Sequence, residues 1–307
     1  METRTRSEEE RTSAGRRPAP RGRRRAKRRA ARWRRRYRWI TAAAGAVIVV
    51  LTYFPLIFVV SNSLKSGQNI FNSGVFSLFT QFDDQNYVTA WSGVSHQLLN
   101  TIVVAAVAIV IGVTAAALGA YAFSQLRFRG KELVFLAYVA LLLVPWTLTL
   151  IPLFLTIQKL HFFNTWWALI LPYAASAQPL LVLIFRGFFE QIPRELLESA
   201  RVDGSTERQV LARIVVPLTR PVLLTGAILV MINVWGDYLW PTIVIQDPAK
   251  TTISAGVQQF VGGLGLNTAS GGAVFAAFVI ATAPMFVLVG FTMRYFVSGL
   301  TEGASKL

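Results

Sequence analysis

Six long apolar stretches constrain this chain more than any other feature of its sequence. They cover approximately residues 39–61, 98–124, 133–157, 165–189, 221–245 and 273–296. A membrane-spanning helix needs about 20 mostly apolar residues, and each stretch is that long. We therefore predict an all-α membrane protein with six transmembrane helices. Internal prolines such as Pro145 and Pro152 are expected to kink these helices where neighbouring helices satisfy the freed carbonyls.

Most of the positive charge lies at the start of the chain. The formal net charge is +16, and residues 1–38 alone hold 17 Arg or Lys and four Glu. Like-charge repulsion and the lack of apolar periodicity predict a disordered, Arg-rich tail over residues 1–37. Such a tail is attracted to anionic lipid. We expect membrane lipid as its contact and no nucleic-acid partner.

The distribution of charge between the loops predicts the orientation in the membrane. The tail, residues 124–132, residues 186–220 and the C-terminal end hold 28 basic residues, and the opposite side holds Lys65, Lys159 and Lys250. Basic residues favour the cytoplasmic side. The sequence therefore predicts a multi-pass protein of a cytoplasmic membrane with both termini in the cytoplasm. Residues 298–307 would form a short cytoplasmic C-terminal tail.

The sequence offers few groups for catalysis or for binding a cofactor. It has no cysteine, two histidines and no Gly-x-x-x-x-Gly-Lys-Ser/Thr motif. A Cys-based metal site, a thiol nucleophile and a nucleotide site of that type are therefore excluded. We expect no enzymatic activity and no cofactor bound by this chain.

The longest cytoplasmic loop, residues 190–218, has signals for two short helices joined by a bend. Pro193 suits the first position of a helix, and Gly204 suits its left-handed end. Thr206 and Gln209 have the spacing of a capping box for the second helix, and Pro217 closes the segment. The first helix mixes charged and apolar residues, as a helix does that lies on a membrane or docks into a groove of a soluble partner.

The same loop resembles the "EAA" loop of ABC importer permeases. The matching residues are Glu198, Ser199 and Ala200, then Gly204, then Ile214 to Pro217. Ser199 and Val216 stand where the family usually has Ala and Leu. The resemblance covers approximately residues 39–307 and is greatest to the carbohydrate-uptake branch, in its second permease subunit (MalG-like). It implies the type I importer fold over residues 38–297.

The resemblance also implies a function and partners. The chain would be the permease subunit of an ATP-driven, binding-protein-dependent importer, and it would form half of the pathway for a di- or oligosaccharide. Its partners would be a homologous second permease, an extracytoplasmic solute-binding protein and two ATPase subunits that hold ATP and Mg. Carried over by position, the residues that couple to the ATPase are Glu195, Glu198, Ser199, Ala200, Asp203, Gly204 and Pro217.

A polar and aromatic set in the second and fifth stretches is a candidate for the substrate pathway. Asp237 is the only acidic residue inside a predicted span, and such a residue is a functional hypothesis by default. An aromatic belt at the membrane surface explains the tryptophans equally well. Gly236 stands where the family usually has Asn. The candidates are Asn100, Asn233, Trp235, Asp237 and Trp240.

Other functions fit the sequence less closely. A permease for a non-sugar solute, such as a glycerol phosphate, is the alternative that the resemblance leaves open. A self-sufficient channel or secondary transporter is expected to show an internal repeat or several membrane-buried charges. A membrane-anchored nucleic-acid binder would depend on the tail alone.

Overall fold

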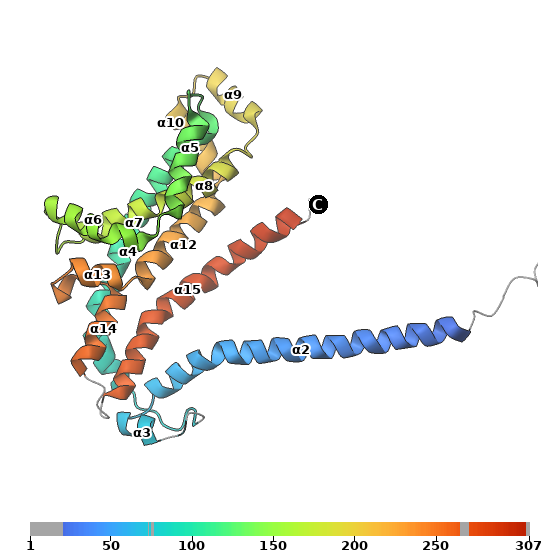
Figure 1. Ribbon diagram of the computed structural model, residues 1–307, viewed down its shortest axis with the longest axis vertical. Coiled ribbons are helices and arrows are strands. Elements are labelled where there is room, and N and C mark those ends of the chain that lie inside the picture. The colour runs from blue at the N-terminus through green and yellow to red at the C-terminus, as the bar shows by residue number, and fades with distance from the viewer. Residues whose placement is uncertain (1–20, 73, 75–76, 265–269, 305–307) are drawn as a thin grey trace, which may run out of the picture. The chain divides into compact units, whose positions relative to one another are not determined.

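The computed structural model shows the chain as an arrangement of helices (Figure 1). It describes residues 21–72, 74, 77–264 and 270–304. Every regular element in those residues is an α-helix or a short 3-10 or π-helical segment. The predicted all-α fold class is therefore confirmed.

The first described helix, α2, is a single helix of 43 residues, Arg21–Ser63. Its apolar part, Trp39–Ser63, is long enough to cross a membrane. The sequence predicts disorder over residues 1–37, but the structure shows helix from Arg21 onward. Residues 1–20 lie outside the described residues. Arginine, lysine and alanine have high helix propensity, so they extend a helix that the apolar part nucleates.

Contacts divide the chain into two compact units, residues 1–58 and residues 59–307, and the helices after α2 belong to the second unit. In chain order these elements are α3 (Gly67–Asn72), α4 (Gln85–Gln125), α5 (Lys131–Ala140), η1 (Leu141–Leu143), α6 (Trp146–Lys159), α7 (Trp167–Ser176), α8 (Gln178–Phe189), α9 (Arg194–Val202), α10 (Glu207–Val210), η2 (Leu211–Val215), α11 (Val216–Leu218), α12 (Arg220–Gly236), α13 (Leu239–Val244), η3 (Pro248–Lys250), α14 (Ile253–Leu264) and α15 (Gly271–Ala304).

Helix α4 is the central element of the second unit and packs against α7, α8, α12, α14 and α15. Its core-facing side carries small residues, and Ala105, Ala108 and Ala116 are fully buried. At Gly112 a Cβ atom would lie 3.4 Å from the Cα of Ala174 in α7. Small side chains therefore let the two backbones approach closely, as is typical of helices that pack inside a membrane.

Three of the predicted spans are single helices, and three are broken. The single ones lie in α2, α4 and α15, and up to six spans result if each bent helix pair counts as one. The pair around α5 and α6 bends by 99°, next to the predicted kink at Pro145, whereas Pro152 lies inside α6. The pair α7 and α8 bends by 43°. Each of these breaks divides a predicted span into two shorter helices that meet at an angle.

The fifth predicted stretch, residues 221–245, differs most from the structure. Helix α12 ends at Gly236, and a separate helix, α13, begins at Leu239. Asp237 leaves the helical conformation with φ −82° and ψ 119°. Its carboxylate accepts hydrogen bonds from the first backbone N–H groups of α13, which gives the break its physical cause.

Candidate functional site

The predicted coupling residues lie on a short helix with one buried and one exposed side. In α9, Leu197 has 1% of its surface exposed and packs in the main core, whereas Val202 is 88% exposed. Ala200 is half-buried. An open cavity of about 430 Å³ lies on the exposed side of α9. It is lined by Glu195, Glu198, Ser199, Val202 and Asp203. Helix α9 therefore exposes a charged and apolar surface while its other side holds it to the bundle.

The end of α9 has the geometry that the sequence predicts. Gly204 has φ +84°, a conformation that glycine adopts without strain. The N–H of Ser205 donates to the carbonyl of Ala200 at 2.9 Å, and the N–H of Gly204 donates to the carbonyl of Arg201 at 3.0 Å. This pair of bonds is a Schellman motif. Gly204 thus supplies the bend between α9 and α10.

The start of α10 is a capping box, as predicted. The side chain of Thr206 accepts from the N–H of Gln209, and the N–H of Thr206 donates to the side chain of Gln209 at 2.8 Å. Pro193 is the N-cap of α9, whereas the sequence predicts it at the first helical position, which Arg194 occupies. The sequence therefore marks the end of α9 at Gly204 and the start of α10 at Thr206, and it places the start of α9 within one residue.

An ionic contact that the sequence does not predict fixes α9 to α4. Arg201 forms a salt bridge with Glu207 at 2.8 Å, and the hydroxyl of Tyr121 donates to the other oxygen of the same carboxylate. The hydrogen bond that Arg201 donates to Glu207 raises the pKa of Arg201 above its ordinary value, so the guanidinium keeps its charge. Three helices, α4, α9 and α10, meet at this carboxylate.

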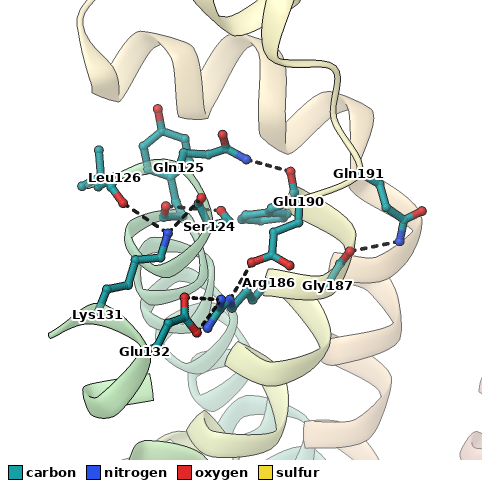
Figure 2. A network of polar contacts seen from close by, with 11 residues as sticks. Ser124, Gln125, Leu126, Lys131, Glu132, Arg186, Gly187, Glu190 and Gln191 are labelled. Carbon is teal, nitrogen blue, oxygen red and sulfur yellow. Dashed lines mark hydrogen bonds and ion pairs between the residues drawn. The ribbon is translucent and has the colours of Figure 1, made fainter. Parts of the chain in front are cut away.

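A second polar network anchors the base of the coupling segment, residues 190–218. Arg186 in α8 binds Glu132 at 2.8 Å and Glu190 at 2.7 Å (Figure 2). Its guanidinium also lies 3.9 Å from the centre of the Phe135 ring. Gln125, at the end of α4, donates to the carbonyl of Phe189 at 2.8 Å. The ends of α4, α5 and α8 are thus joined where the coupling segment begins.

Pro217 lies where the segment turns into α12. It follows the π-helical segment η2, and the helices on either side of Thr219 meet at 82°. Proline has no backbone N–H, so the carbonyl four residues earlier cannot be satisfied in the usual helical way, and a wider turn is favoured. Pro217 therefore shapes the connection between the coupling segment and α12.

A cavity of about 560 Å³ lies among α6, α7, α12 and α13, and we name it the Asp237 cavity. Its lining residues are Trp146, Thr149, Leu153, Pro172, Tyr173, Ser176, Ile232, Asn233, Gly236, Asp237 and Trp240. Three of the five predicted pathway residues, Asn233, Asp237 and Trp240, are among them. The mixture of aromatic, hydroxyl and carboxylate groups can contact a polar solute with an apolar face.

Asp237 also has a structural role at this cavity. One carboxylate oxygen accepts from the Tyr173 hydroxyl at 3.0 Å, and the other accepts from the N–H groups of Leu239 at 2.9 Å and Trp240 at 3.2 Å. The indole of Trp240 is 1% exposed and donates to the carbonyl of Ala168 at 2.8 Å. Both residues therefore tie α13 to α7, in addition to facing the cavity.

The other two predicted pathway residues are placed elsewhere. Asn100 donates to the carbonyls of Ala249 at 2.7 Å and Thr251 at 3.0 Å, so it holds the chain next to η3. The indole of Trp235 donates to the carbonyl of Ala281 at 2.9 Å and packs in a second core cluster. Neither residue lines the Asp237 cavity. Tyr173 and Trp146, which do line it, carry no motif that sequence reasoning could have used.

Apolar spans, an anchored helix with an exposed polar side, and a cavity between the spans define a membrane-embedded transport subunit. Residues 108–302 match the family model described as "Binding-protein-dependent transport system inner membrane component". The chain belongs to this family, and the resemblance to ABC importer permeases is confirmed.

Curated relatives cover most of the chain. The probable ABC transporter permease protein YurM of Bacillus subtilis is 33% identical over 88% of this chain and 91% of its own length. The trehalose transport system permease protein SugB of Mycobacterium tuberculosis is 32% identical over 86% and 96%. The trehalose/maltose transport system permease protein MalG of Thermococcus litoralis is 31% identical over 85% and 95%.

A solved structure shows the same fold. A chain of a bacterial ABC transporter involved in the import of the acidic polysaccharide alginate superposes with a TM-score of 0.75 at 24% identity. The match covers 85% of this chain and 97% of that chain. The importer permease fold predicted over most of the sequence is therefore confirmed.

Proposed function

We propose that this chain is the permease subunit of an ATP-driven importer for a di- or oligosaccharide, and that a separate polypeptide hydrolyses the ATP. The relatives named for trehalose and maltose support the sugar as substrate class. The described contacts give the exposed side of the anchored coupling segment no role within this chain. This supports the proposal that the chain depends on a partner.

The proposed assembly has four kinds of subunit. This chain pairs with a homologous permease, two ATPase subunits dock on the coupling segments, and an extracytoplasmic binding protein delivers the solute. ATP and Mg belong to the ATPase, and this chain binds no cofactor. The excess of basic residues on one side of the spans supports a cytoplasmic coupling segment with both termini on that side.

The contacts within the chain support a route by which the ATPase would act on the solute pathway. A force on the exposed side of α9 reaches α4 through Arg201, Glu207 and Tyr121. It reaches α12 through the bend at Pro217. Helix α12 carries Asn233 and Gly236 at the Asp237 cavity. Movement of α9 would therefore change the shape of the cavity, as coupling requires.

The single observation that carries this proposal is the exposed, anchored α9, and reversal of one of its charges tests it. In the complete transporter in proteoliposomes, Glu198→Arg is expected to leave assembly in the membrane unchanged and to lower the solute transported per ATP hydrolysed at least tenfold. Arg208→Gln, an exposed change in α10 outside the α9 cavity, is the matched control. Normal coupling in Glu198→Arg would contradict the proposal.

The substrate class needs its own measurement. Candidate binding proteins loaded with trehalose, maltose or glycerol 3-phosphate are added to the reconstituted transporter, and ATP hydrolysis is measured. We expect stimulation by a sugar-loaded binding protein. Stimulation only by the binding protein loaded with glycerol 3-phosphate would refute a sugar as the substrate class and would leave the coupling role intact.

A further inference from the structure

A polar cleft lies between the end of α4, the loop that follows it and α9. Its volume is about 410 Å³, and we name it the basic cleft. It is lined by Ser124, Gln125, Leu126, Arg127, Lys131, Arg194, Leu197, Glu198, Arg201 and Glu207. Four of these residues are basic and two are acidic, so the cleft has an excess of positive charge.

Within the residues that the structure describes, three of the four basic side chains form no salt bridge. Arg201 is paired with Glu207, but in the described part of the chain Arg127, Lys131 and Arg194 form no salt bridge. Lys131 donates instead to the carbonyls of Ser124 at 3.2 Å and Leu126 at 3.3 Å (Figure 2). Unpaired cations that converge on one cleft favour an anionic ligand.

An apolar groove of about 430 Å³ adjoins the basic cleft and shares Leu126, Arg127 and Lys131 with it. Phe128 and Leu133 line this groove and are 45% and 73% exposed. Glu132 lines it as well, and its charge is held in the salt bridge with Arg186 at 2.8 Å. The groove leads onto α5, which has no buried residue and also exposes Leu136. The cleft side of the shared residues is therefore mainly charged, and the groove side adds the apolar Phe128 and Leu133 and the paired Glu132.

The position in the fold indicates which anion fits. Gln125 ends the α4 span and Lys131 begins the next apolar segment, so the loop between them lies at a membrane surface. A soluble anion would use the cleft but not the groove. An acidic segment of a soluble partner would not follow an apolar groove along a membrane-spanning helix. A phospholipid satisfies both parts, because its phosphate and its acyl chains are joined.

We propose that this site binds an anionic glycerophospholipid, with the headgroup in the basic cleft and an acyl chain in the apolar groove along α5. The phosphate lies between Arg127 and Lys131, which line both parts. Arg194 reaches the headgroup from α9. A bound lipid would thereby connect the membrane surface to the helix on which we propose the ATPase docks, although the lipid site itself does not depend on that proposal.

Photolabelling tests the site in the full chain reconstituted into phosphatidylcholine nanodiscs. A diazirine-bearing phosphatidylglycerol is added, and the labelled peptides are mapped by mass spectrometry. Mapping by position is needed because the basic tail also attracts anionic lipid. We expect labelling of residues 126–136 that unlabelled phosphatidylglycerol competes away, whereas phosphatidylcholine and inorganic phosphate do not.

Charge-removing variants distinguish this site from general surface attraction. Arg127→Gln and Arg194→Gln are each expected to weaken the competition by phosphatidylglycerol about fivefold. Arg129→Gln removes an equal charge from the same loop but lines neither the cleft nor the groove, so it should have little effect. Equal effects of Arg127→Gln and Arg129→Gln would overturn the proposal. Competition by inorganic phosphate, or protection of the peptide by an added ATPase subunit in place of lipid, would overturn it as well.

Discussion

The hydroxyl of Tyr121, near the end of α4, donates a hydrogen bond to the carboxylate of Glu207 in α10. The same carboxylate holds Arg201 of α9, so one acidic group connects the central helix of the bundle to both helices of the coupling segment. Loss of this hydroxyl removes one of the links between α4 and the exposed helix without changing the exposed surface of α9.

Tyr121→Phe should therefore weaken coupling more than it weakens folding. A hydrogen bond to a carboxylate that is about half exposed is expected to contribute about 1 kcal/mol to stability. We expect ATP hydrolysis to continue while the solute transported per ATP falls several-fold in proteoliposomes. Tyr138→Phe is the control, because in the described residues the Tyr138 hydroxyl forms no hydrogen bond. An equal loss in both variants would argue against the link.

Gly204→Ala should destabilise the coupling segment through the backbone alone. The space around Gly204 is open, but its φ of +84° costs another residue about 1–2 kcal/mol. Gly187→Ala is a matched control, since its surroundings are equally open and it lies in the regular helix α8. Limited proteolysis of the loop should be faster in Gly204→Ala and unchanged in Gly187→Ala. Equal rates in the two variants would mean that the turn is not needed.

Gly226→Ala should disturb the packing of α12 on α8. An added Cβ would collide with the ring of Phe185, whose Cε1 atom would lie at 2.8 Å, and Phe185 is fully buried. Overpacking of this kind costs about 1–3 kcal/mol. At Gly112 the nearest atom would lie at an ordinary 3.4 Å, so Gly112→Ala serves as the control. The thermal midpoint of the detergent-purified chain should fall only for Gly226→Ala.

Substitutions at Asp237 separate its structural role from a role in the pathway. Asp237→Ala removes the acceptor for the first N–H groups of α13 and should cost about 1 kcal/mol. Asn caps helices about as well as Asp, so Asp237→Asn should keep the thermal midpoint close to that of the unchanged chain. We expect Asp237→Asn to alter solute transport nevertheless, because the carboxylate faces the cavity. Transport by Asp237→Asn at the original rate would leave Asp237 a structural residue only.

The sequence predicts those parts of the site that are determined by local chemistry. Gly204 as a left-handed helix end and Thr206 with Gln209 as a capping box are both confirmed, because each depends on residues within one turn. The sequence also predicts helices long enough to span a membrane, since the length of the apolar stretches follows from the thickness of a membrane.

Contacts between distant segments were not predicted. Glu207 binds Tyr121, which is 86 residues away in the chain, and no local pattern shows that the two meet. The sequence does not predict the break at Asp237, for a related reason. A long apolar stretch with one acidic residue resembles one helix, and only the contact from Tyr173 on α7 and the capping of α13 show why the chain turns there.

The most direct test of the central claim, that α9 is the surface on which the ATPase docks, is maleimide labelling of a single cysteine at Val202, a highly exposed position of α9. The chain has no cysteine of its own, so Val202→Cys provides the only thiol. In inside-out membrane vesicles stripped of the ATPase, we predict rapid labelling that stops when the purified ATPase is added back. Leu160→Cys, at an exposed position in the loop after α6, should label only in right-side-out vesicles and should be unaffected by the ATPase. Labelling of Val202→Cys that is unchanged by the ATPase, or that occurs only from the outside, would contradict the account.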